Sequence, residues 1–267
     1  MDQPLAGRTV VITRAASQAS ELIATLEGYG AKVFACPTIE ITEPESYQLL
    51  DEAIDHLYGY DWLLFTSTNG VDFFLRRLVH LGKSVADLDD LKVCAIGEAT
   101  AERLQQAHIH VDVVAGEAKA EGVFNALVDF VGGQANLVGL NFLLPRAAVA
   151  RDFLPSALAA AGARVDAVPA YRTVIPADLD RGRLTAMLAG SADCIVFTSP
   201  STVKNLALLF DTFDLSTILT GISVACIGDV SAITAAEYGL KVEIQPNRST
   251  TATLAQAIAD YYGEARH

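Results

Sequence analysis

The sequence has no long uninterrupted hydrophobic run, and this absence excludes a membrane-spanning helix. No apolar stretch reaches the roughly 18 residues that such a helix needs. The opening residues MDQPL also lack the basic and then apolar stretches of a secretory signal, so we expect a cytoplasmic protein.

Cysteine and histidine are too few and too scattered to predict a disulfide framework or a metal centre. The four cysteines lie in or beside short apolar runs and form no C-x-x-C pair, which favours buried free thiols. His108 and His110 are close in sequence, but no third metal ligand lies near them. We therefore expect no metal site.

Several catalytic signatures are missing as well. The chain contains no G-x-x-x-x-G-K-[ST] loop, no G-x-G-x-x-G after a predicted strand and no G-x-S-x-G elbow. No pair of carboxylates stands out in the loops that follow the predicted strands. These absences disfavour the usual acid–base and nucleophilic chemistry, and they favour catalysis by positioning of the substrate.

The composition is that of a folded acidic protein. Hydrophobic residues make up 51% of the chain and charged residues 19%, which is typical of globular proteins. The formal net charge of −13 repels nucleic acids and anionic membranes. An anionic ligand would therefore need a locally favourable pocket.

Two parts of the chain resemble each other at a nearly constant separation. Residues 7–37 align with residues 139–169, and identical pairs include Arg14 with Arg146 and Pro37 with Pro169. The same separation relates DWLLFTS at 61–67 to DCIVFTS at 193–199, and VCAIG at 93–97 matches VACIG at 224–228 one residue closer. The repeats predict an internal duplication, with two copies of one structural unit.

Strand patterns alternate with helix patterns along the chain. Short apolar runs predict strands at 9–13, 31–36, 62–66, 92–96, 111–114, 142–144, 195–197, 226–227 and 242–244. Helical spacing predicts helices at 17–29, 47–57, 70–80, 98–106 and 120–130. The alternation predicts an α/β fold in which each half is a doubly wound, flavodoxin-like parallel sheet covered on both faces.

The domain boundary has two possible positions. Pro37 and Pro169 occupy equivalent places after equivalent predicted strands, and proline does not continue a central strand. The chain either divides near Gly139 or crosses between domains after each proline, which would make the first domain discontinuous.

The predicted strand ends carry the candidate chemistry. Ligands of open α/β sheets bind at the carboxyl ends of the strands, and here those ends lead into loops rich in hydroxyls and glycine. The loops lie at 13–14, 66–70, 97–100, 145–146, 198–202, 228–231 and 247–251. Their hydroxyls can simply cap helices, but several helix starts around one cleft would also bind a ligand with many carboxylates.

The order and spacing of six segments resemble those of the uroporphyrinogen-III synthase family. They are VVITR at 10–14, FTSTNGV at 65–71, AIG at 95–97 with Thr100, PAYRT at 169–173, FTSPS at 197–201 and CIG at 226–228 with Ser231. The resemblance covers nearly the whole chain. It implies two flavodoxin-like domains, one formed by 1–37 and 171–267 and the other by 40–168. A two-stranded hinge at 38–39 and 169–170 would join them.

The resemblance also implies a reaction, namely cyclisation of hydroxymethylbilane with inversion of its terminal pyrrole ring. This is a lyase step of haem biosynthesis that needs no cofactor. Tyr171 matches the family's tyrosine, and we expect it to help the hydroxyl leave as a donor or general acid. The expected substrate-binding residues, in a cleft between the halves, are Arg14, Ser67, Asn69, Gly97, Thr100, Ser199, Ser201, Gly228 and Ser231.

Two other functions remain possible from the sequence. A two-lobed nucleotide-sugar transferase would suit paired α/β domains, although no nucleotide signature is apparent. A non-catalytic hinge-type binding protein would also suit them, although such proteins usually carry an export signal. We expect a monomer that takes a small-molecule substrate, binds neither nucleic acid nor membrane, and contacts the preceding pathway enzyme transiently.

Overall fold

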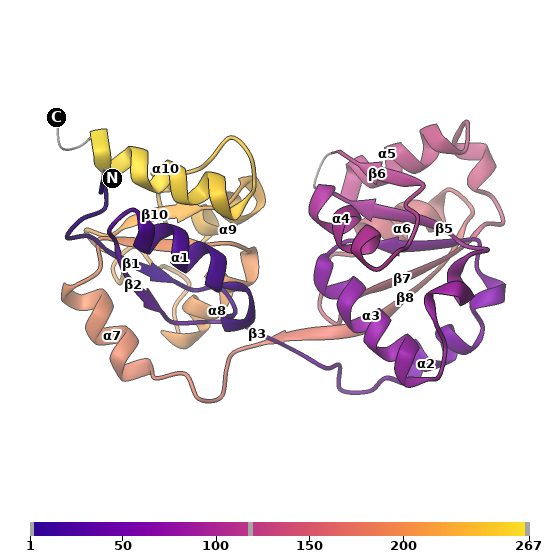
Figure 1. The fold of residues 1–267 in the computed structure, drawn as a ribbon, viewed down its shortest axis with the longest axis horizontal. Coiled ribbons are helices and arrows are strands. Elements are labelled where there is room, and N and C mark those ends of the chain that lie inside the picture. Colours follow the sequence, from indigo (N-terminus) through magenta and orange to yellow (C-terminus); the bar gives the residue numbers. More distant parts are fainter. Residues whose placement is uncertain (1–2, 117–119, 265–267) are drawn as a thin grey trace. The chain divides into compact units, whose positions relative to one another are not determined.

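The computed structural model describes residues 3–116 and 120–264, and it has the predicted mixed α/β architecture with parallel sheets (Figure 1). The chain divides into two compact units. Unit 1 comprises Met1–Glu40 and Val174–His267, and unit 2 comprises Ile41–Thr173. Among the described residues, no helix combines the length and the apolar character needed to cross a bilayer.

Unit 1 contains a parallel sheet in the order β10-β9-β1-β2. Its strands are β1 (Thr9–Ile12), β2 (Lys32–Ala35), β9 (Cys194–Phe197) and β10 (Ser223–Cys226). Its α-helices are α1 (Ser20–Gly28), α7 (Arg181–Gly190), α8 (Pro200–Leu209), α9 (Asp229–Glu237) and α10 (Thr251–Glu264). The two central strands, β1 and β9, lie far apart in the sequence, so this sheet forms only by long-range pairing.

The side chains of β1 alternate between the two faces of the unit 1 sheet. Val10 and Ile12 pack in a core with α1 and α10, which lie on the same face (Figure 1). Val11 points the other way into a core formed with α7, α8 and α9. A strand covered on both faces needs apolar residues throughout, which explains the continuous run at this position.

Unit 2 contains a sheet in the order β3-β8-β7-β4-β5-β6. Its strands are β3 (Glu40–Thr42), β4 (Trp62–Phe65), β5 (Lys92–Ile96), β6 (Val113–Ala115), β7 (Asn141–Ala147) and β8 (Arg164–Val174). Its α-helices are α2 (Gln48–Asp55), α3 (Thr68–His80), α4 (Glu98–Gln106), α5 (Ala120–Phe130) and α6 (Phe153–Ala160). The pairings of β8 with β7, β7 with β4, β4 with β5 and β5 with β6 are all parallel.

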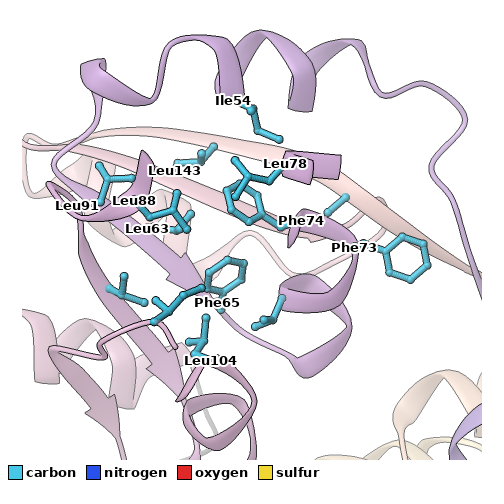
Figure 2. Packing of buried hydrophobic residues seen from close by; sticks show 14 of the residues in the cluster. Ile54, Leu63, Phe65, Phe73, Phe74, Leu78, Leu88, Leu91, Leu104 and Leu143 are labelled. Carbon is cyan, nitrogen blue, oxygen red and sulfur yellow. The ribbon is translucent and has the colours of Figure 1, made fainter. Parts of the chain in front are cut away.

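The unit 2 sheet also separates two cores. Leu63 and Phe65 of β4 pack with Leu143 and with Phe74 and Leu78 of α3, as Figure 2 shows. The intervening residues of β4 face the second core, which includes α5 and α6. The first of these cores contains Val71, Phe73, Phe74 and Leu78 and so holds α3 against the sheet, and the first turn of α3 carries part of the candidate site.

Pro169 does not end its strand, so that expectation is wrong. β8 continues through this residue to Val174. The register passes from Arg146 opposite Pro169 to Ala147 opposite Tyr171, which marks an irregularity of the β-bulge type. The residue left out of the pairing is Ala170, directly after Pro169, and bulges are among the few places where a sheet accepts proline.

The crossings between units fall at the ends of two neighbouring strands. The chain leaves unit 1 after Glu40, inside β3, and returns to it at Val174, the last residue of β8. The sequence analysis put Tyr171 in the first domain, whereas this division assigns it to unit 2. The continuation of β8 beyond Pro169 accounts for the difference.

The predicted strand at 242–244 is reduced to a single bridge between Ile244 and Ala225. It still extends the unit 1 sheet beyond β10 in the parallel direction. The segment 242–244 is short and contains or adjoins the polar residues Lys241 and Glu243. It makes too few ladder hydrogen bonds with β10 to form a regular strand.

Candidate functional site

The candidate catalytic residue, Tyr171, lies near the end of β8 in unit 2. Its side chain is largely buried, and the whole residue is 8% exposed. The ring stacks on Phe73 of α3 with a centroid separation of 5.7 Å and an interplanar angle of 30°. The backbone carbonyl accepts a hydrogen bond from the Ala148 N–H at 2.8 Å, so both ring and backbone are held in place.

The Tyr171 hydroxyl lies against the start of α3. Its oxygen is 3.0 Å from Oγ of Ser67, and either group could be the donor. Ser67 is the N-cap of α3, and its Oγ accepts a hydrogen bond from the Gly70 N–H at 3.0 Å. A Cβ atom on Gly70 would lie 3.1 Å from the Pro145 carbonyl oxygen, so glycine permits this close approach of the helix to β7.

Two opposing effects act on the pKa of Tyr171. Burial raises it, while hydrogen bonds with Ser67 and Asn69 lower it, and the pKa remains above the ordinary value for a phenol. The phenol therefore keeps its proton at neutral pH. Unit 2 thus brings together three of the predicted site residues, Ser67, Asn69 and Tyr171, although Ser67 and Tyr171 are 104 positions apart.

The neighbouring strand of unit 2 ends in another predicted segment. Gly97 precedes α4 with φ of 74°, a conformation that favours glycine, and its N–H donates to the Ala115 carbonyl at 3.1 Å. Thr100, in the first turn of α4, is buried. Because β5 lies next to β4, this helix start follows the strand beside the one that leads to Ser67.

Unit 1 has corresponding residues at its own strand ends. Arg14 follows β1, and its Nε donates to the Gln18 carbonyl at 2.9 Å. Burial lowers the pKa of this guanidinium, while nearby Glu21 acts in the opposite direction. Arg14 therefore fastens the loop that leads to α1, besides presenting a partly buried positive charge.

Ser199 begins α8 in unit 1, as Ser67 begins α3 in unit 2. Its backbone is extended, as at Ser67, but its side chain makes no capping hydrogen bond. Within the described part of the chain, its Oγ is buried and has no hydrogen-bond partner. Ser201 lies in the first turn of the same helix.

The last predicted pair lies at the start of α9. Gly228 has an extended backbone, and a Cβ atom there would collide with Oγ of Ser249. Ser231 is buried in the first turn of the helix. Glycine is thus favoured at Gly228 by a neighbouring side chain, and at Gly97 by backbone conformation.

Several residues near the strand ends were missing from the sequence prediction. Arg146 pairs with Asp152 at 2.6 Å and donates to the Arg151 carbonyl at 3.1 Å. Its side chain is 18% exposed, so it is mostly buried. The repeat match to Arg14 was the signal that could have included it.

The segment after β2 is also held by residues that the sequence prediction omitted. Thr38 is fully buried, and its Oγ1 donates to the Thr202 carbonyl at 3.1 Å. Asn205 of α8 donates from Nδ2 to the Thr38 carbonyl at 2.9 Å. These contacts fix the path of unit 1 just before the chain crosses to unit 2.

Two surface pockets lie at the amino ends of strands rather than at the carboxyl ends. One is lined in part by Lys92, His108 and Asp112, and the other by Ser223, Gly239 and Glu243. Neither pocket is lined by a predicted site residue. Across residues 3–116 and 120–264, no cluster of three histidine, cysteine or acidic side chains has the geometry of a metal site.

Comparison with known proteins identifies relatives over almost the full length. A family described as uroporphyrinogen-III synthase HemD matches residues 20–256. The uroporphyrinogen-III synthase of Synechococcus elongatus is 33% identical over 97% of this chain and 97% of its own length. The one from Chlorobaculum parvum is 29% identical over 95% of this chain and 98% of its own length.

Solved structures share the fold. A crystal structure of a mutant uroporphyrinogen III synthase from Thermus thermophilus matches with a TM-score of 0.67 and 19% identity, covering 97% of this chain and all of that one. The uroporphyrinogen-III synthetase of Helicobacter pylori matches with a TM-score of 0.59 and 17% identity, covering 95% and 99% of the two chains.

Proposed function

The chain belongs to the uroporphyrinogen-III synthase family, enzymes of tetrapyrrole biosynthesis, and we propose from this that it cyclises hydroxymethylbilane with inversion of the terminal pyrrole ring. The main structural support for this reaction is the environment of the Tyr171 hydroxyl. It is held by Ser67 at the start of α3 and keeps its proton at neutral pH. A protonated phenol is the kind of group that can assist departure of a hydroxyl.

The proposed first step is loss of water from the substrate. The bond between carbon and the terminal hydroxyl oxygen breaks, the electron pair leaves with oxygen, and the Tyr171 proton converts the leaving group to water. The pyrrole nitrogen supplies electrons to the carbon, which leaves a cationic azafulvene and a phenolate. The substituted carbon of the last ring then attacks the azafulvene carbon and forms a spiro intermediate. The original bond from that ring to its methylene carbon breaks, the unsubstituted carbon of the same ring bonds to this methylene, and the proton it loses returns to the phenolate.

The chief task of the protein is then to hold the substrate in one bent shape. The substrate can also close without inversion in free solution, so the enzyme must favour one conformation before chemistry occurs. We assign binding of its carboxylates to Arg14, Asn69, Gly97, Thr100, Ser199, Ser201, Gly228 and Ser231. In support, most of them lie at the starts of α3, α4, α8 and α9, and the positive end of a helix dipole attracts anions.

We also propose that the two units arose by duplication and that β3 and β8 form a two-stranded connection. The order β2-β1-β9-β10 of unit 1 has its counterpart in β8-β7-β4-β5 of unit 2. Asp193 accepts a hydrogen bond from the Thr9 N–H at 2.8 Å, and Asp61 accepts one from the Asn141 N–H at the same distance. The two aspartates thus accept hydrogen bonds from the first residues of equivalent strands, which supports a common origin of the units.

Freshly prepared hydroxymethylbilane provides the direct test. We expect the wild-type protein to yield the type III isomer, resolved after oxidation, above the type I product that forms spontaneously. Well-folded protein that gives only type I product at working concentrations would refute the proposed function.

The variant Tyr171→Phe tests the role of the phenol. Its turnover should fall by about tenfold or more, because a donor at the leaving group is lost. Tyr60→Phe is a matched control, since Tyr60 donates to Asp166 at 2.7 Å in the same unit and has no proposed role in the reaction. Equal turnover of Tyr171→Phe and wild type would remove the assigned role of Tyr171.

A further inference from the structure

The Ser67 hydroxyl has two neighbours inside unit 2, and together they restrict what it can do. Its Oγ accepts from the Gly70 N–H at 3.0 Å and lies 3.0 Å from the Tyr171 hydroxyl. A serine hydroxyl has one proton and two lone pairs. With one lone pair engaged by the helix start, its proton is available for the phenol oxygen.

We propose that Ser67 is a positioning residue for Tyr171, donating its proton to the phenol oxygen so that the phenol proton points toward the leaving hydroxyl of the substrate. This inference rests on the proposed function and gives Ser67 a different role from binding a carboxylate. In the opposite arrangement Tyr171 would donate to Ser67, and its proton would be turned toward the protein. The chain of donors runs from the Gly70 N–H to Ser67, from Ser67 to Tyr171, and from Tyr171 to the substrate.

The surroundings of the phenol suit its role as a proton donor. Hydrogen bonds with Ser67 and Asn69 both lower the pKa of Tyr171, which is the effect of groups that donate to the phenolate oxygen. After proton transfer the same two donors would stabilise the phenolate. The buried ring, stacked on Phe73, has little freedom to turn away from them.

Charged groups on the adjacent elements are engaged elsewhere. Arg76 lies over the Phe73 ring at 4.0 Å, and Arg103 pairs with Asp72 at 2.6 Å. On β8 itself, Arg172 pairs with Glu45 at 3.1 Å. Burial and the hydrogen bonds with Ser67 and Asn69, rather than a neighbouring charge, therefore set the pKa of the phenol.

Ser199 shows that this arrangement is specific to one helix start. It occupies the corresponding position in unit 1, yet within the described residues its Oγ has no hydrogen-bond partner, and no capping bond is made. The serine at this place of the repeat therefore does not by itself create a donor chain. At Ser67, the Tyr171 hydroxyl and the Gly70 N–H provide the two partners of the chain.

The test combines the titration of Tyr171 with steady-state kinetics. Tyrosine labelled with carbon-13 at Cζ gives an NMR signal for each phenol. The signal of Tyr171 is identified as the one that is missing from the Tyr171→Phe variant. In Ser67→Ala we expect the Tyr171 pKa to rise by about one unit and kcat to fall about tenfold, with KM changing less than about twofold. Ser67→Thr, which keeps the hydroxyl, should restore both.

Further variants guard against a purely structural effect. Ser67→Asp keeps a capping acceptor but has no proton to donate, so its kcat should fall as in Ser67→Ala even if the alanine variant is unstable. In a Tyr171→Phe background, Ser67→Ala should change kcat less than about twofold, because the two residues act through one hydrogen bond. Ser199→Ala should leave the Tyr171 titration unchanged.

Two results would overturn the proposal. One is a folded Ser67→Ala or Ser67→Asp variant with wild-type kcat and an unmoved Tyr171 titration. The other is a loss confined to KM with the titration unmoved, which would make Ser67 a substrate-binding residue. Absence of type III product from the wild-type protein would instead refute the proposed function, while the titrations would still show whether Ser67 stabilises the Tyr171 phenolate.

Discussion

Gly97 and Gly228 begin helices at equivalent places, but different physical causes favour glycine at each. Gly97 combines φ of 74° with ψ of 159°, a region that is almost closed to other residues, although a Cβ atom there would meet nothing within 4 Å. Gly228 is extended, and the obstacle is Oγ of Ser249. The repeat match predicts glycine at both positions but cannot distinguish these causes.

Alanine substitutions should separate the two cases. We expect Gly97→Ala to lower the free energy of unfolding by about 1–3 kcal/mol, because the strained backbone persists whatever the neighbours do. Gly228→Ala should lower it by less than about 1 kcal/mol, because the Ser249 hydroxyl can rotate away. Urea unfolding followed by circular dichroism measures both changes.

A second substitution supplies the control for this pair. In a Ser249→Ala background, the effect of Gly228→Ala should largely disappear, while that of Gly97→Ala should persist. An undiminished loss from Gly228→Ala in that background would show that Ser249 is not the obstacle.

The candidate site was only partly predictable from individual residues. The loop positions of Ser67 and Tyr171 follow from strand patterns and family resemblance, but their contact does not. It joins residues 104 positions apart and depends on the packing of α3 over β7. The sequence also could not show that the Ser199 hydroxyl is buried without a hydrogen-bond partner among the residues that the structure describes, since the same Phe-Thr-Ser motif precedes both helices.

At the scale of elements, α4 and α9 end in the same way. Each is followed by a residue in the left-handed conformation, His108 with φ of 61° and Gly239 with φ of 77°. The next N–H returns to the helix in both, from Ile109 to Leu104 at 3.1 Å and from Leu240 to Ala235 at 3.0 Å. This is the Schellman arrangement, for which glycine is the preferred residue.

His108→Gly should therefore stabilise the protein. We expect a gain of up to about 1 kcal/mol, because relief of the left-handed strain exceeds the larger entropy that glycine loses on folding. The measurement is the shift of the denaturant midpoint at unchanged slope. Gly239→Ala is the opposite test, since its Cβ would collide with Oδ1 of Asp214, and it should destabilise. A destabilised His108→Gly variant would contradict this reasoning.

Most regular elements of the fold were predictable because their patterns are local. The predicted strand at 92–96 and the predicted helices at 98–106 and 120–130 correspond to β5, α4 and α5. β3 was missed because its three residues become a strand only by lying beside β8, more than 120 positions later. The bulge after Pro169 escaped prediction for the same reason, since pairing with β7 creates it.

At the scale of the whole molecule, unit 2 is one continuous stretch, whereas unit 1 is made from two. Each face of the unit 2 sheet has its own apolar core, formed by residues of that unit alone. In unit 1, the central strand β1 pairs with β2 on one side and with the distant β9 on the other. The two units therefore depend very differently on chain continuity.

This difference predicts the behaviour of fragments. A chain of residues 41–173 should fold alone and unfold cooperatively in urea, with a circular dichroism spectrum of mixed helix and strand. A fragment of residues 1–40 should stay unfolded, because β1 lacks its β9 neighbour. A 41–173 fragment without a cooperative transition would show that its two cores do not suffice.

The divided first unit has a consequence for synthesis on the ribosome. The apolar strand at Thr9–Ile12 leaves the exit tunnel before its partner Cys194–Phe197, which is translated only after the entire inserted unit. Translation proceeds at roughly 5–20 residues per second, so the edge of β1 stays unpaired for on the order of ten seconds or more before β9 is made. Unit 2 of the nascent chain should therefore fold before unit 1, and chaperones that shield apolar strands have their longest opportunity at β1.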